Sequence, residues 1–257
     1  MENQKKVVFI SGATSGFGEA TARIFAQNGY DLIVTGRRNE RLIQLQTELQ
    51  HATDALILPL CFDVRNENEV NTAIKSIPES WTDRLQIVIN NAGLAVGRSP
   101  IDEGIIDDWE RMIDTNIKGL LYVSKALIPF LKAKKSGHIF NLGSIAGKEV
   151  YASGNVYCAT KHAVDALSQS MRIDLVAYNI KVTNIAPGAA DTEFSLVRFK
   201  GDQQTADATY HGFQPLIAQD IAETIYFVAT RPPHVTINDL VIMPTAQASA
   251  TVFHRSN

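Results

Sequence analysis

The sequence predicts an α/β protein in which a parallel β-sheet is covered by helices on both faces. Short uninterrupted apolar runs, such as residues 7–10 and 85–89, are typical of strands that are buried on both faces of such a sheet. Longer stretches with apolar residues at helical spacing lie between these runs, the clearest at residues 107–131. No linker, internal repeat or low-complexity segment divides the chain, so we expect a single domain over residues 1–257.

The composition argues against several classes of protein. A hydrophobic share of 45% is enough for a sizeable core, and a net charge of -3 gives no reason to expect nucleic acid or a membrane surface as the partner. We therefore expect a small-molecule substrate. The chain shows no secretory apolar region near its start and no apolar run of the ~18 residues that span a membrane, which favours a cytoplasmic protein. Cys61 and Cys158 are too few for a disulfide framework and lack a metal-ligand spacing, so we expect ordinary thiols and no metal.

The first predicted strand runs into a glycine-rich turn. Gly12, Gly16 and Gly18 lead into a helix over residues 21–28, which ends at the C-cap residue Gly29. Such glycines allow the backbone to turn tightly and to approach a pyrophosphate, whose charge is held by amides at the helix N-terminus. A glycine trio alone is also compatible with a flexible turn, but the buried strand before it and the capped helix after it favour dinucleotide binding. The residues assigned to this contact are Ser11, Gly12, Thr14, Ser15, Gly16, Phe17 and Gly18.

The second predicted strand, residues 31–35, ends in Gly36-Arg37-Arg38. An enzyme that uses NAD would need an acidic residue about 20 positions after the glycine turn, to accept a hydrogen bond from the ribose 2′-hydroxyl. Gly36 occupies that place, and the two arginines offer forked donors to a 2′-phosphate, so the sequence predicts NADP(H) as cofactor. The alternative is a solvated basic loop that also contains Arg41.

Two further predicted strands, residues 55–60 and 85–89, also end in candidate nucleotide contacts. Helices predicted over residues 39–50 and 67–77 precede these two strands. The carboxylate of Asp63 could accept a hydrogen bond from the adenine amino group. The segment Asn90-Asn91-Ala92-Gly93 stands where the ribose needs amide hydrogen bonds and a close-packed glycine, although it could also be an ordinary turn. The residues assigned to the cofactor here are Asp63, Val64, Asn90, Ala92 and Gly93.

The helix predicted over residues 107–131 carries an apolar stripe that contains one amide. Asn116 falls on this stripe, seven positions after Trp109 and three after Ile113. A buried amide must find hydrogen-bond partners, so Asn116 is either an oddity of packing or part of a polar relay. We favour the relay and count Asn116 among the catalytic candidates.

The segment from Ser144 to Lys161 is the strongest candidate for catalytic chemistry. Tyr157 and Lys161 are four positions apart in a predicted helix, so the phenol and the ammonium share one face and can meet. A free phenol has a pKa of about 10, which a nearby cation such as Lys161 would lower. Ser144 follows the strand at residues 138–142 and could donate to a substrate oxygen at the carboxyl end of the sheet. Any helix can carry an exposed tyrosine and lysine at this spacing, so the pair gains weight from the other motifs.

The last third of the chain supplies the predicted cover of the site. A strand over residues 179–185 leads into a loop that we expect to close over the nicotinamide and its phosphate. The residues assigned to the cofactor in this loop are Pro187, Gly188 and Thr192. Residues 189–215 are polar and interrupted by glycines, which predicts a substrate lid. A final strand at residues 239–243 precedes a tail over residues 244–257.

In their order along the chain, these motifs resemble those of the short-chain dehydrogenase/reductase family over essentially the whole length. The resemblance implies a Rossmann-type, doubly wound sheet of seven strands in the order 3-2-1-4-5-6-7, and assembly as a homotetramer or dimer. It also implies four roles: Tyr157 as general acid/base, Ser144 orienting the substrate oxygen, Lys161 lowering the phenol pKa and binding ribose, and Asn116 holding a water in a proton relay.

A closer resemblance is to family members that act on short 3-hydroxy acids, L-serine or L-allo-threonine, or that reduce malonic semialdehyde. It rests on Gly36-Arg37-Arg38, residues 154–157, residues 192–201 and the closing residues 243–255. These substrates carry a carboxylate, for which Arg198 in the lid is a candidate partner. An arginine in a polar lid is, however, often only solvated.

The expected function is therefore NADP(H)-dependent interconversion of a 3-hydroxy acid, such as 3-hydroxypropionate, serine or allo-threonine, and its oxo or semialdehyde form. Sulfoacetaldehyde or another small aldehyde or ketone is the alternative substrate, since a sulfonate would suit the same cation. An alternative of another class is a catalytically silent NADPH-binding sensor or scaffold.

Overall fold

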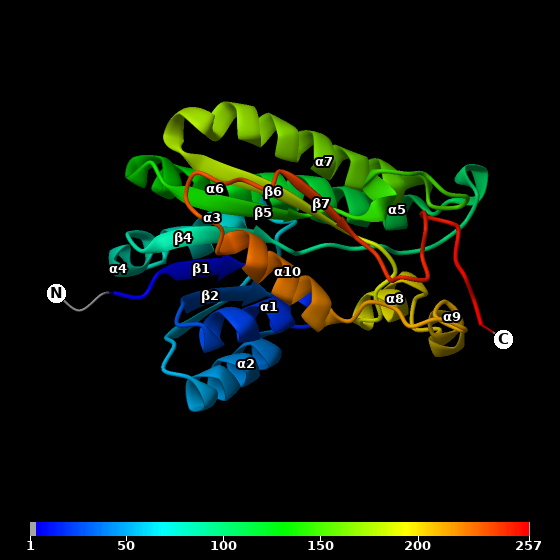
Figure 1. Ribbon diagram of the computed structural model, residues 1–257, viewed down its shortest axis with the longest axis horizontal. Helices are drawn as coiled ribbons and strands as arrows, with labels where there is room; N and C mark the ends of the chain where they lie inside the picture. Colours follow the sequence, from blue (N-terminus) through cyan, green and yellow to red (C-terminus); the bar gives the residue numbers. More distant parts are fainter. Residues whose placement is uncertain (1–3, 257) are drawn as a thin grey trace.

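The structure, a computed structural model, describes residues 4–256, without the side chains of residues 206 and 207. Its strands are β1 (Val7–Ile10), β2 (Asp31–Gly36), β3 (Ile57–Cys61), β4 (Leu85–Asn90), β5 (Gly137–Leu142), β6 (Ile180–Pro187) and β7 (Asp239–Ile242). They form one parallel sheet in the order β3-β2-β1-β4-β5-β6-β7 (Figure 1). The predicted fold class and strand order are confirmed.

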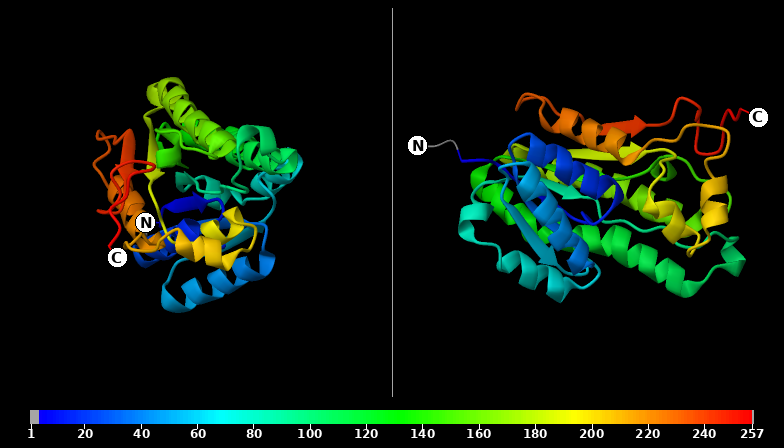
Figure 2. Two further views of the ribbon diagram at one scale, coloured as in Figure 1. Left: turned by 90° about the vertical axis from the view of Figure 1, so that its right-hand side faces the viewer. Right: turned by 90° about the horizontal axis from the view of Figure 1, so that it is seen from below.

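Helices cover both faces of this sheet. Within the described residues, the α-helices are α1 (Gly16–Gln27), α2 (Asn39–Ala52), α3 (Glu67–Lys75), α4 (Glu79–Thr82), α5 (Ile106–Ile113), α6 (Leu120–Lys134), α7 (Asn155–Leu175), α8 (Glu193–Arg198), α9 (Gln203–Ala208) and α10 (Ala218–Ala229). Helices α1, α2 and α10 pack on one face, and α3, α6 and α7 pack on the other (Figures 1 and 2). Short 3-10 helices lie at Ile101–Glu103, Ile145–Gly147 and Val176–Tyr178.

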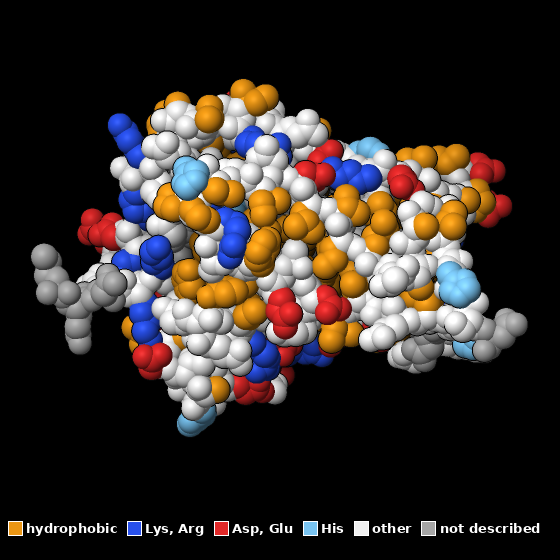
Figure 3. Space-filling model, viewed as in Figure 1, with side chains coloured by type: hydrophobic (Ala, Val, Ile, Leu, Met, Phe, Trp, Pro, Cys, Tyr) orange, Lys and Arg blue, Asp and Glu red, His pale blue; other side chains and the backbone are white. Residues whose placement is uncertain are grey.

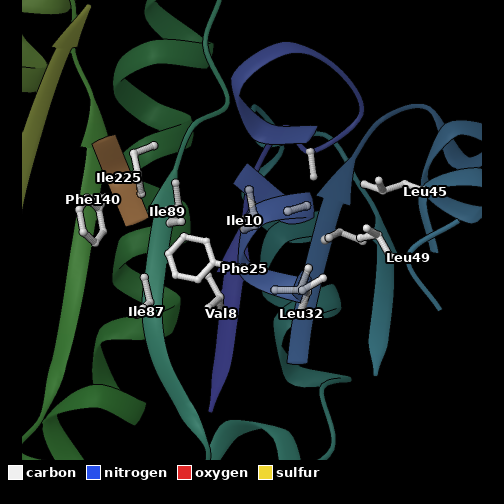
Figure 4. Close-up of a cluster of buried hydrophobic side chains, with 14 of the residues drawn as sticks. Val8, Ile10, Phe25, Leu32, Leu45, Leu49, Ile87, Ile89, Phe140 and Ile225 are labelled. Atoms are coloured by element: carbon white, nitrogen blue, oxygen red, sulfur yellow. The ribbon is translucent and has the colours of Figure 1, made fainter. Parts of the chain in front are cut away.

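Strand β1 shows why the apolar runs of the sequence are uninterrupted. Its side chains alternate between the faces: Val8 and Ile10 belong to the core beneath α1 and α10, whereas Val7 and Phe9 belong to the core beneath α6 and α7. All four side chains are fully buried. Figure 4 shows Val8, Ile10 and Phe25 together in the first of these cores. A strand with both faces buried has no position at which a polar residue is favoured.

The parallel strands all end at one edge of the sheet, and this edge carries the site. The chain leaves β1 toward β2 on one side and returns to β4 on the other, so a crevice opens at the carboxyl end of β1. Helices α8 and α9 and the C-terminal tail lie at this same end of the molecule (Figure 1).

Several elements differ from the prediction. The single helix expected over residues 107–131 is instead α5 and α6 separated by a π-helical segment, Asp114–Gly119. A π turn inserts an extra residue into the helix, which periodicity alone does not reveal. The lid contains the short helices α8 and α9, and α10 was not predicted although its buried residues follow helical spacing. None of the helices in the described part of the chain combines the length and the apolar character that a membrane span requires.

Candidate active site

A cleft of about 1130 Å3 opens at the carboxyl edge of the sheet. Its walls come from the glycine turn, the ends of β2, β4 and β5, the start of α7, the lid and the tail. The predicted residues that line it are Gly12, Thr14, Ser15, Gly16, Phe17, Arg37, Arg38, Asp63, Val64, Ala92, Gly93, Ser144, Tyr157, Lys161, Pro187, Gly188, Thr192 and Arg198. Ser11, Gly18, Asn90 and Asn116 are not among the lining residues. The fold therefore brings most of the predicted site residues into one space.

The glycine turn has the geometry that a pyrophosphate needs. Gly12 and Gly16 have φ angles of 67° and 55°, in the left-handed region that favours glycine. A Cβ atom at Gly12 would lie 2.9 Å from the Cα of Ala92, and one at Gly18 would overlap the carbonyl oxygen of Gly12. Ser15, the N-cap residue of α1, makes no side-chain capping bond, so the first amides of the helix keep their donors. Open amides at a helix N-terminus fit an anionic ligand.

Ser11 and Asn91 join the turn after β1 to the turn after β4. Ser11 Oγ accepts hydrogen bonds from the backbone amides of Asn91 and Ala92, both at 3.0 Å. Asn91 Nδ2 in turn donates to the carbonyl oxygens of Ser11 and Gly12, at 3.0 and 2.9 Å. The role of Asn91 was missed, since a structural amide and a cofactor contact look alike in the sequence.

Asn90 differs from its neighbours because its side chain turns away from the cleft. Its Nδ2 donates to Ser124 Oγ at 3.0 Å and to Asn141 Oδ1 at 2.8 Å, and the residue is buried. The structure therefore does not bring the side-chain amide of Asn90 to the cofactor cleft, contrary to the expectation from its place after the predicted strand at residues 85–89. Residues alternate across a strand, and Asn90 is still part of β4, so its side chain points into a layer of the core.

Arg38 is fixed on the glycine turn. Its Nη2 donates to Thr14 Oγ1 at 2.9 Å and to Ser15 Oγ at 2.8 Å, and its Nε donates to Thr14 Oγ1 at 3.2 Å. Arg37 is more exposed, and its Nη1 lies 3.7 Å from Asp63 Oδ2. The two arginines predicted to bind the 2′-phosphate thus differ in side-chain mobility, because of the two only Arg38 is held by several neutral partners.

Glu193 bridges Arg38 and Arg41 from the lid. Its Oε2 lies 3.1 Å from Arg38 Nη1, and its Oε1 lies 2.6 Å from Arg41 Nη1. Burial acts to raise the pKa of Glu193, but the hydrogen bonds from Arg41 and Arg38 outweigh it and hold that pKa below its usual range. Arg41 entered the sequence analysis only as part of a solvated loop, and Glu193 was missed because the contact spans more than 150 residues.

The carboxylate of Asp63 is bound by a neighbouring arginine. It accepts hydrogen bonds from the Nε and Nη2 atoms of Arg65, at 2.9 and 2.6 Å for Oδ2. Burial acts to raise the pKa of Asp63, yet these bonds keep it below the usual range. Contact with an adenine amino group stays a prediction, since the carboxylate lines the cleft while bound to Arg65.

Tyr157, Ser144 and Lys161 meet on the floor of the cleft. Burial raises the pKa of the Tyr157 phenol, while a hydrogen bond with Ser144 and the charge of Arg198 act to lower it. Lys161 Nζ donates to the carbonyl oxygen of Leu142 at 2.7 Å and lies 5.9 Å from the centre of the Tyr157 ring. Burial also lowers the pKa of Lys161, to about 8. Burial therefore has the largest effect on the pKa of both groups, and the lowering of the phenol pKa by Lys161 stays a prediction.

Asn116 lies behind this floor, in the π-helical segment. Its Oδ1 accepts from the backbone amide of Leu94 at 2.7 Å, and its Nδ2 donates to the Leu94 carbonyl at 2.8 Å and to Thr160 Oγ1 at 3.0 Å. The buried amide has thus found partners, as predicted for a residue on an apolar stripe. These bonds hold the chain that follows β4 against α7, and a role in a water relay stays a prediction.

Arg198 enters the cleft from the lid and lies beside Tyr157. Its Nη2 donates to the hydroxyl of Tyr151 at 2.9 Å, and its Cζ lies 5.5 Å from the ring centres of both Tyr151 and Tyr157. Its Nε is buried and has no hydrogen-bond partner within the described residues. A guanidinium with an unused buried donor suits an anionic ligand. The part played by Tyr151 was missed, although it lies in the loop between Ser144 and Tyr157.

The lid and the tail close two other sides of the cleft. Thr192 packs on the glycine turn, because a Cβ atom built at Gly16 would lie 3.5 Å from the Cβ atom of Thr192. Gln247 of the tail accepts a hydrogen bond from the backbone amide of Ala189 at 2.7 Å, next to Gly188. The tail contact was not predicted, because it depends on the path of a segment without regular structure.

Comparisons with known proteins show the family of the chain. Residues 6–202 match the model of a protein family described as short chain dehydrogenase. The chain belongs to the short-chain dehydrogenase family. The family prediction made from the motifs is therefore confirmed.

Individual short-chain dehydrogenases are similar over nearly the whole chain. The NADP-dependent 3-hydroxy acid dehydrogenase YdfG of Salmonella typhi is 45% identical over 252 residues, which cover 97% of this chain and 100% of that protein. A sulfoacetaldehyde reductase of Chromohalobacter salexigens is 47% identical over 242 residues, which cover 94% of each protein. A closed form of serine dehydrogenase complexed with NADP+ has a TM-score of 0.90 and 44% identity, covering 97% of this chain and 100% of that one.

Proposed function

We propose that the protein is an NADP(H)-dependent oxidoreductase that interconverts a short 3-hydroxy acid and its oxo or semialdehyde form. The observation that carries this proposal is the guanidinium of Arg198, which lies 5.5 Å from the ring of Tyr157 within the cleft that the glycine turn also lines. One cleft therefore contains a cation that can bind an acid group, a phenol that can transfer a proton, and a glycine turn that can bind a dinucleotide. The similar 3-hydroxy acid and serine dehydrogenases support the same substrate class.

The cofactor half of the cleft fits NADP(H). The amides at the start of α1 and the space left by Gly12 and Gly16 would hold the pyrophosphate, and Arg37 and Arg38 would hold the 2′-phosphate. Asp63, Val64, Ala92 and Gly93 line the cleft and would contact the adenosine and the ribose. Pro187, Gly188 and Thr192 also line it and would contact the nicotinamide. When bound, the nicotinamide ring supplies or accepts the hydride.

The chain itself moves the proton. Tyr157 donates its phenolic proton to the substrate carbonyl oxygen in reduction and takes a proton from the substrate hydroxyl in oxidation. Ser144 lines the same cleft as Tyr157, so it orients the same substrate oxygen. The buried ammonium of Lys161 favours the phenolate that forms at Tyr157 on reduction. Asn116 holds the segment after β4 that forms the opposite wall.

Arg198 selects the substrate. A carboxylate or a sulfonate one or two carbons from the carbonyl would place its oxygens at the guanidinium while the carbonyl stays near Tyr157. The unused buried donor at Arg198 Nε is the group that this anion would satisfy. A reductase for sulfoacetaldehyde is the second candidate, favoured by the similar sulfoacetaldehyde reductase and by the same cation.

A substrate panel tests the proposal. Loss of NADPH absorbance is followed with malonic semialdehyde, sulfoacetaldehyde and the uncharged propanal, and NADPH formation is followed with 3-hydroxypropionate, L-serine and L-allo-threonine. We expect malonic semialdehyde to give a kcat/KM at least tenfold above that of propanal. Preference for sulfoacetaldehyde would transfer the function to the second candidate, and tight NADPH binding with no turnover of any of these compounds would contradict both.

We also propose that copies of the chain assemble into a homotetramer or a dimer. Strand β7 is an edge strand, and Phe227 on α10 and Val241 on β7 are 50% and 42% exposed. Figure 3 shows hydrophobic side chains gathered over α10 and β7. An exposed apolar edge is usually covered, and a second copy covers it by two-fold symmetry. Light scattering during gel filtration should give a multiple of 28.2 kDa that falls in Val241→Asp, and a monomeric wild type would contradict this.

A cytoplasmic location fits the chemistry that we propose. Cys61 is an exposed free thiol, and such thiols persist where the compartment is reducing. Fractionation of cells that express the tagged protein would test this location.

A further inference from the structure

The lid is held at the point where it carries Arg198. Arg198 is the last residue of α8, and its carbonyl oxygen accepts a hydrogen bond from the backbone amide of Gly97 at 3.0 Å. Two residues later, Lys200 Nζ lies 2.7 Å from Oδ2 of Asp108, which belongs to α5. The position of the guanidinium therefore depends on contacts between the lid and a different part of the chain.

In the ion pair between Asp108 and Lys200, the carboxylate is the buried partner. The Asp108 side chain is 7% exposed, while that of Lys200 is 48% exposed. A buried carboxylate that loses its partner is strongly unfavourable, so the carboxylate holds Lys200 in place. Arg111 approaches Asp108 only to 4.0 Å, which makes Lys200 the closer cation.

The backbone on both sides of this ion pair is unusual. Lys200 has a φ angle of 55°, a left-handed conformation that costs a residue with a side chain about 1 kcal/mol and that glycine normally adopts after a helix. Gly97 has a φ angle of 73°, and a Cβ atom there would lie 2.6 Å from Asp108 Oδ2. Lys200 therefore adopts a backbone conformation that would cost a glycine less. Gly97 leaves the space that the carboxylate of Asp108 occupies.

The same strip of chain also carries contacts to the catalytic floor. Leu94, three residues before Gly97, is bound through both backbone groups to the side chain of Asn116. The backbone of Arg198 is thus bound through Gly97 to the segment that Asn116 holds. The lid next to Arg198 is bound through Lys200 to α5. Both routes lead to elements that contact α7, which carries Tyr157.

We propose that Asp108 and Lys200 are positioning residues, which hold Arg198 beside Tyr157 and so set the preference for anionic substrates. This inference rests on the proposed function, because it requires Arg198 to bind the substrate anion. Without the pair, the end of α8 keeps the Gly97 bond and the hydrogen bond from Arg198 to Tyr151 but loses its tie to α5, so the guanidinium is held less firmly. The anion must then order the arginine as it binds, which raises KM for charged substrates and leaves the chemical step unchanged.

The test compares Lys200→Met and Asp108→Asn with the wild type. Steady-state rates are measured with malonic semialdehyde and with propanal, and NADPH binding is measured by fluorescence. We expect KM for malonic semialdehyde to rise about 3- to 10-fold in both variants, with kcat and NADPH affinity unchanged and with KM for propanal unchanged. Lys200→Arg should restore much of the loss, since it keeps the charge opposite Asp108.

Lys118→Met is the matched control. Lys118 is 53% exposed and pairs with Asp114 at 2.8 Å, so its substitution removes a comparable lysine and ion pair that do not touch the lid. Its KM values should equal those of the wild type. Because Asp108 is buried and its variant could lose stability, Lys200→Met is the decisive variant, and a thermal melt accompanies both.

Three outcomes separate this inference from the proposed function. If Arg198→Met lowers the preference for the anion but Lys200→Met and Asp108→Asn do not, the positioning role is wrong and the proposed function stands. If Arg198→Met leaves the preference unchanged, the proposed recognition fails and the inference fails with it. If Lys200→Met weakens anion binding while Asp108→Asn strengthens it, Lys200 acts as a direct ligand, which overturns the positioning role.

Discussion

The two halves of the cleft are built in different ways. The cofactor half consists mainly of backbone: glycines with positive φ, open amides at the start of α1, and the short bonds between Ser11 and Asn91. The substrate half consists of side chains from distant segments, with Arg198 from the lid, Tyr151 from the loop before α7 and Gln247 from the tail.

This difference teaches which half tolerates change. A cradle made of backbone requires particular glycines and binds a part of the cofactor that never varies. A pocket made of side chains can be altered residue by residue without disturbing the sheet. We therefore expect substitutions in each half to change the binding of one ligand only, with exceptions where a residue belongs to both halves.

Tyr157 stands at the junction of the two halves, and its loss should have the largest effect. Tyr157→Phe removes the proton donor without changing the shape of the cleft, so we expect turnover to fall roughly 1000-fold. NADPH affinity, measured by fluorescence titration, should change less than about twofold, because the phenol is only one of many contacts. Tyr178→Phe, outside the cleft, serves as the control. Undiminished turnover in Tyr157→Phe would remove this residue from the mechanism.

Lys161 is the buried charge at the same junction. Its pKa is about 8 in the folded protein against 10.5 for an unperturbed lysine, so the unfolded chain binds more protons between these pH values. Stability must then rise as the pH rises from 8 to 10.5, by up to about 3 kcal/mol from this group. The Lys161→Met variant lacks this contribution to the pH dependence of stability. Lys134, whose pKa is also about 8, contributes equally in the variant and in the wild type. Urea unfolding at several pH values should show the difference, and parallel pH curves would contradict it.

The arginines after β2 belong to the cofactor half alone. Replacing Arg37 and Arg38 by glutamine should weaken NADPH roughly 10- to 100-fold, since each charge-assisted hydrogen bond is worth about 1.5–3 kcal/mol. NADH binding should change much less, and the ratio of rates with malonic semialdehyde and propanal should stay constant. Equal losses for both cofactors would mean that the pair does not contact a 2′-phosphate.

Glu193 lies in the lid but binds arginines of the cofactor half. Its substitution should have the smallest effect of those considered. Its carboxylate occupies donors of Arg38 and Arg41 that a 2′-phosphate would also use. Glu193→Gln removes this competing anion, so NADPH should bind about two- to fivefold more tightly and NADH about equally. Glu48→Gln, which loses a similarly exposed pair with Arg23, should leave both affinities unchanged. Weaker NADPH binding in Glu193→Gln would show that the carboxylate supports the phosphate site.

The same division explains how far the sequence could be interpreted. The fold and the cofactor cradle depend on local patterns, such as the buried strand β1, the glycines after it and the arginines after β2. The ion pair of Asp108 with Lys200 and the bridge from Glu193 to Arg38 and Arg41 depend on the path of the lid, which no local pattern specifies.

Two single residues mark this boundary. Asn116 was recognised because an amide interrupts an apolar stripe, yet the π turn that carries it was not, since an inserted residue leaves the stripe nearly intact. Asn90 was assigned to the cofactor from its place after the predicted strand at residues 85–89, whereas its side chain points into the core. One residue of register decides between the two faces of a strand.

The recognition of an anion beside Tyr157 is the central claim, and the ratio of kcat/KM for malonic semialdehyde to kcat/KM for propanal tests it most directly. In Arg198→Met this ratio should fall roughly 10- to 100-fold relative to the wild type, with the propanal value nearly unchanged. A ratio that equals that of the wild type would contradict the claim.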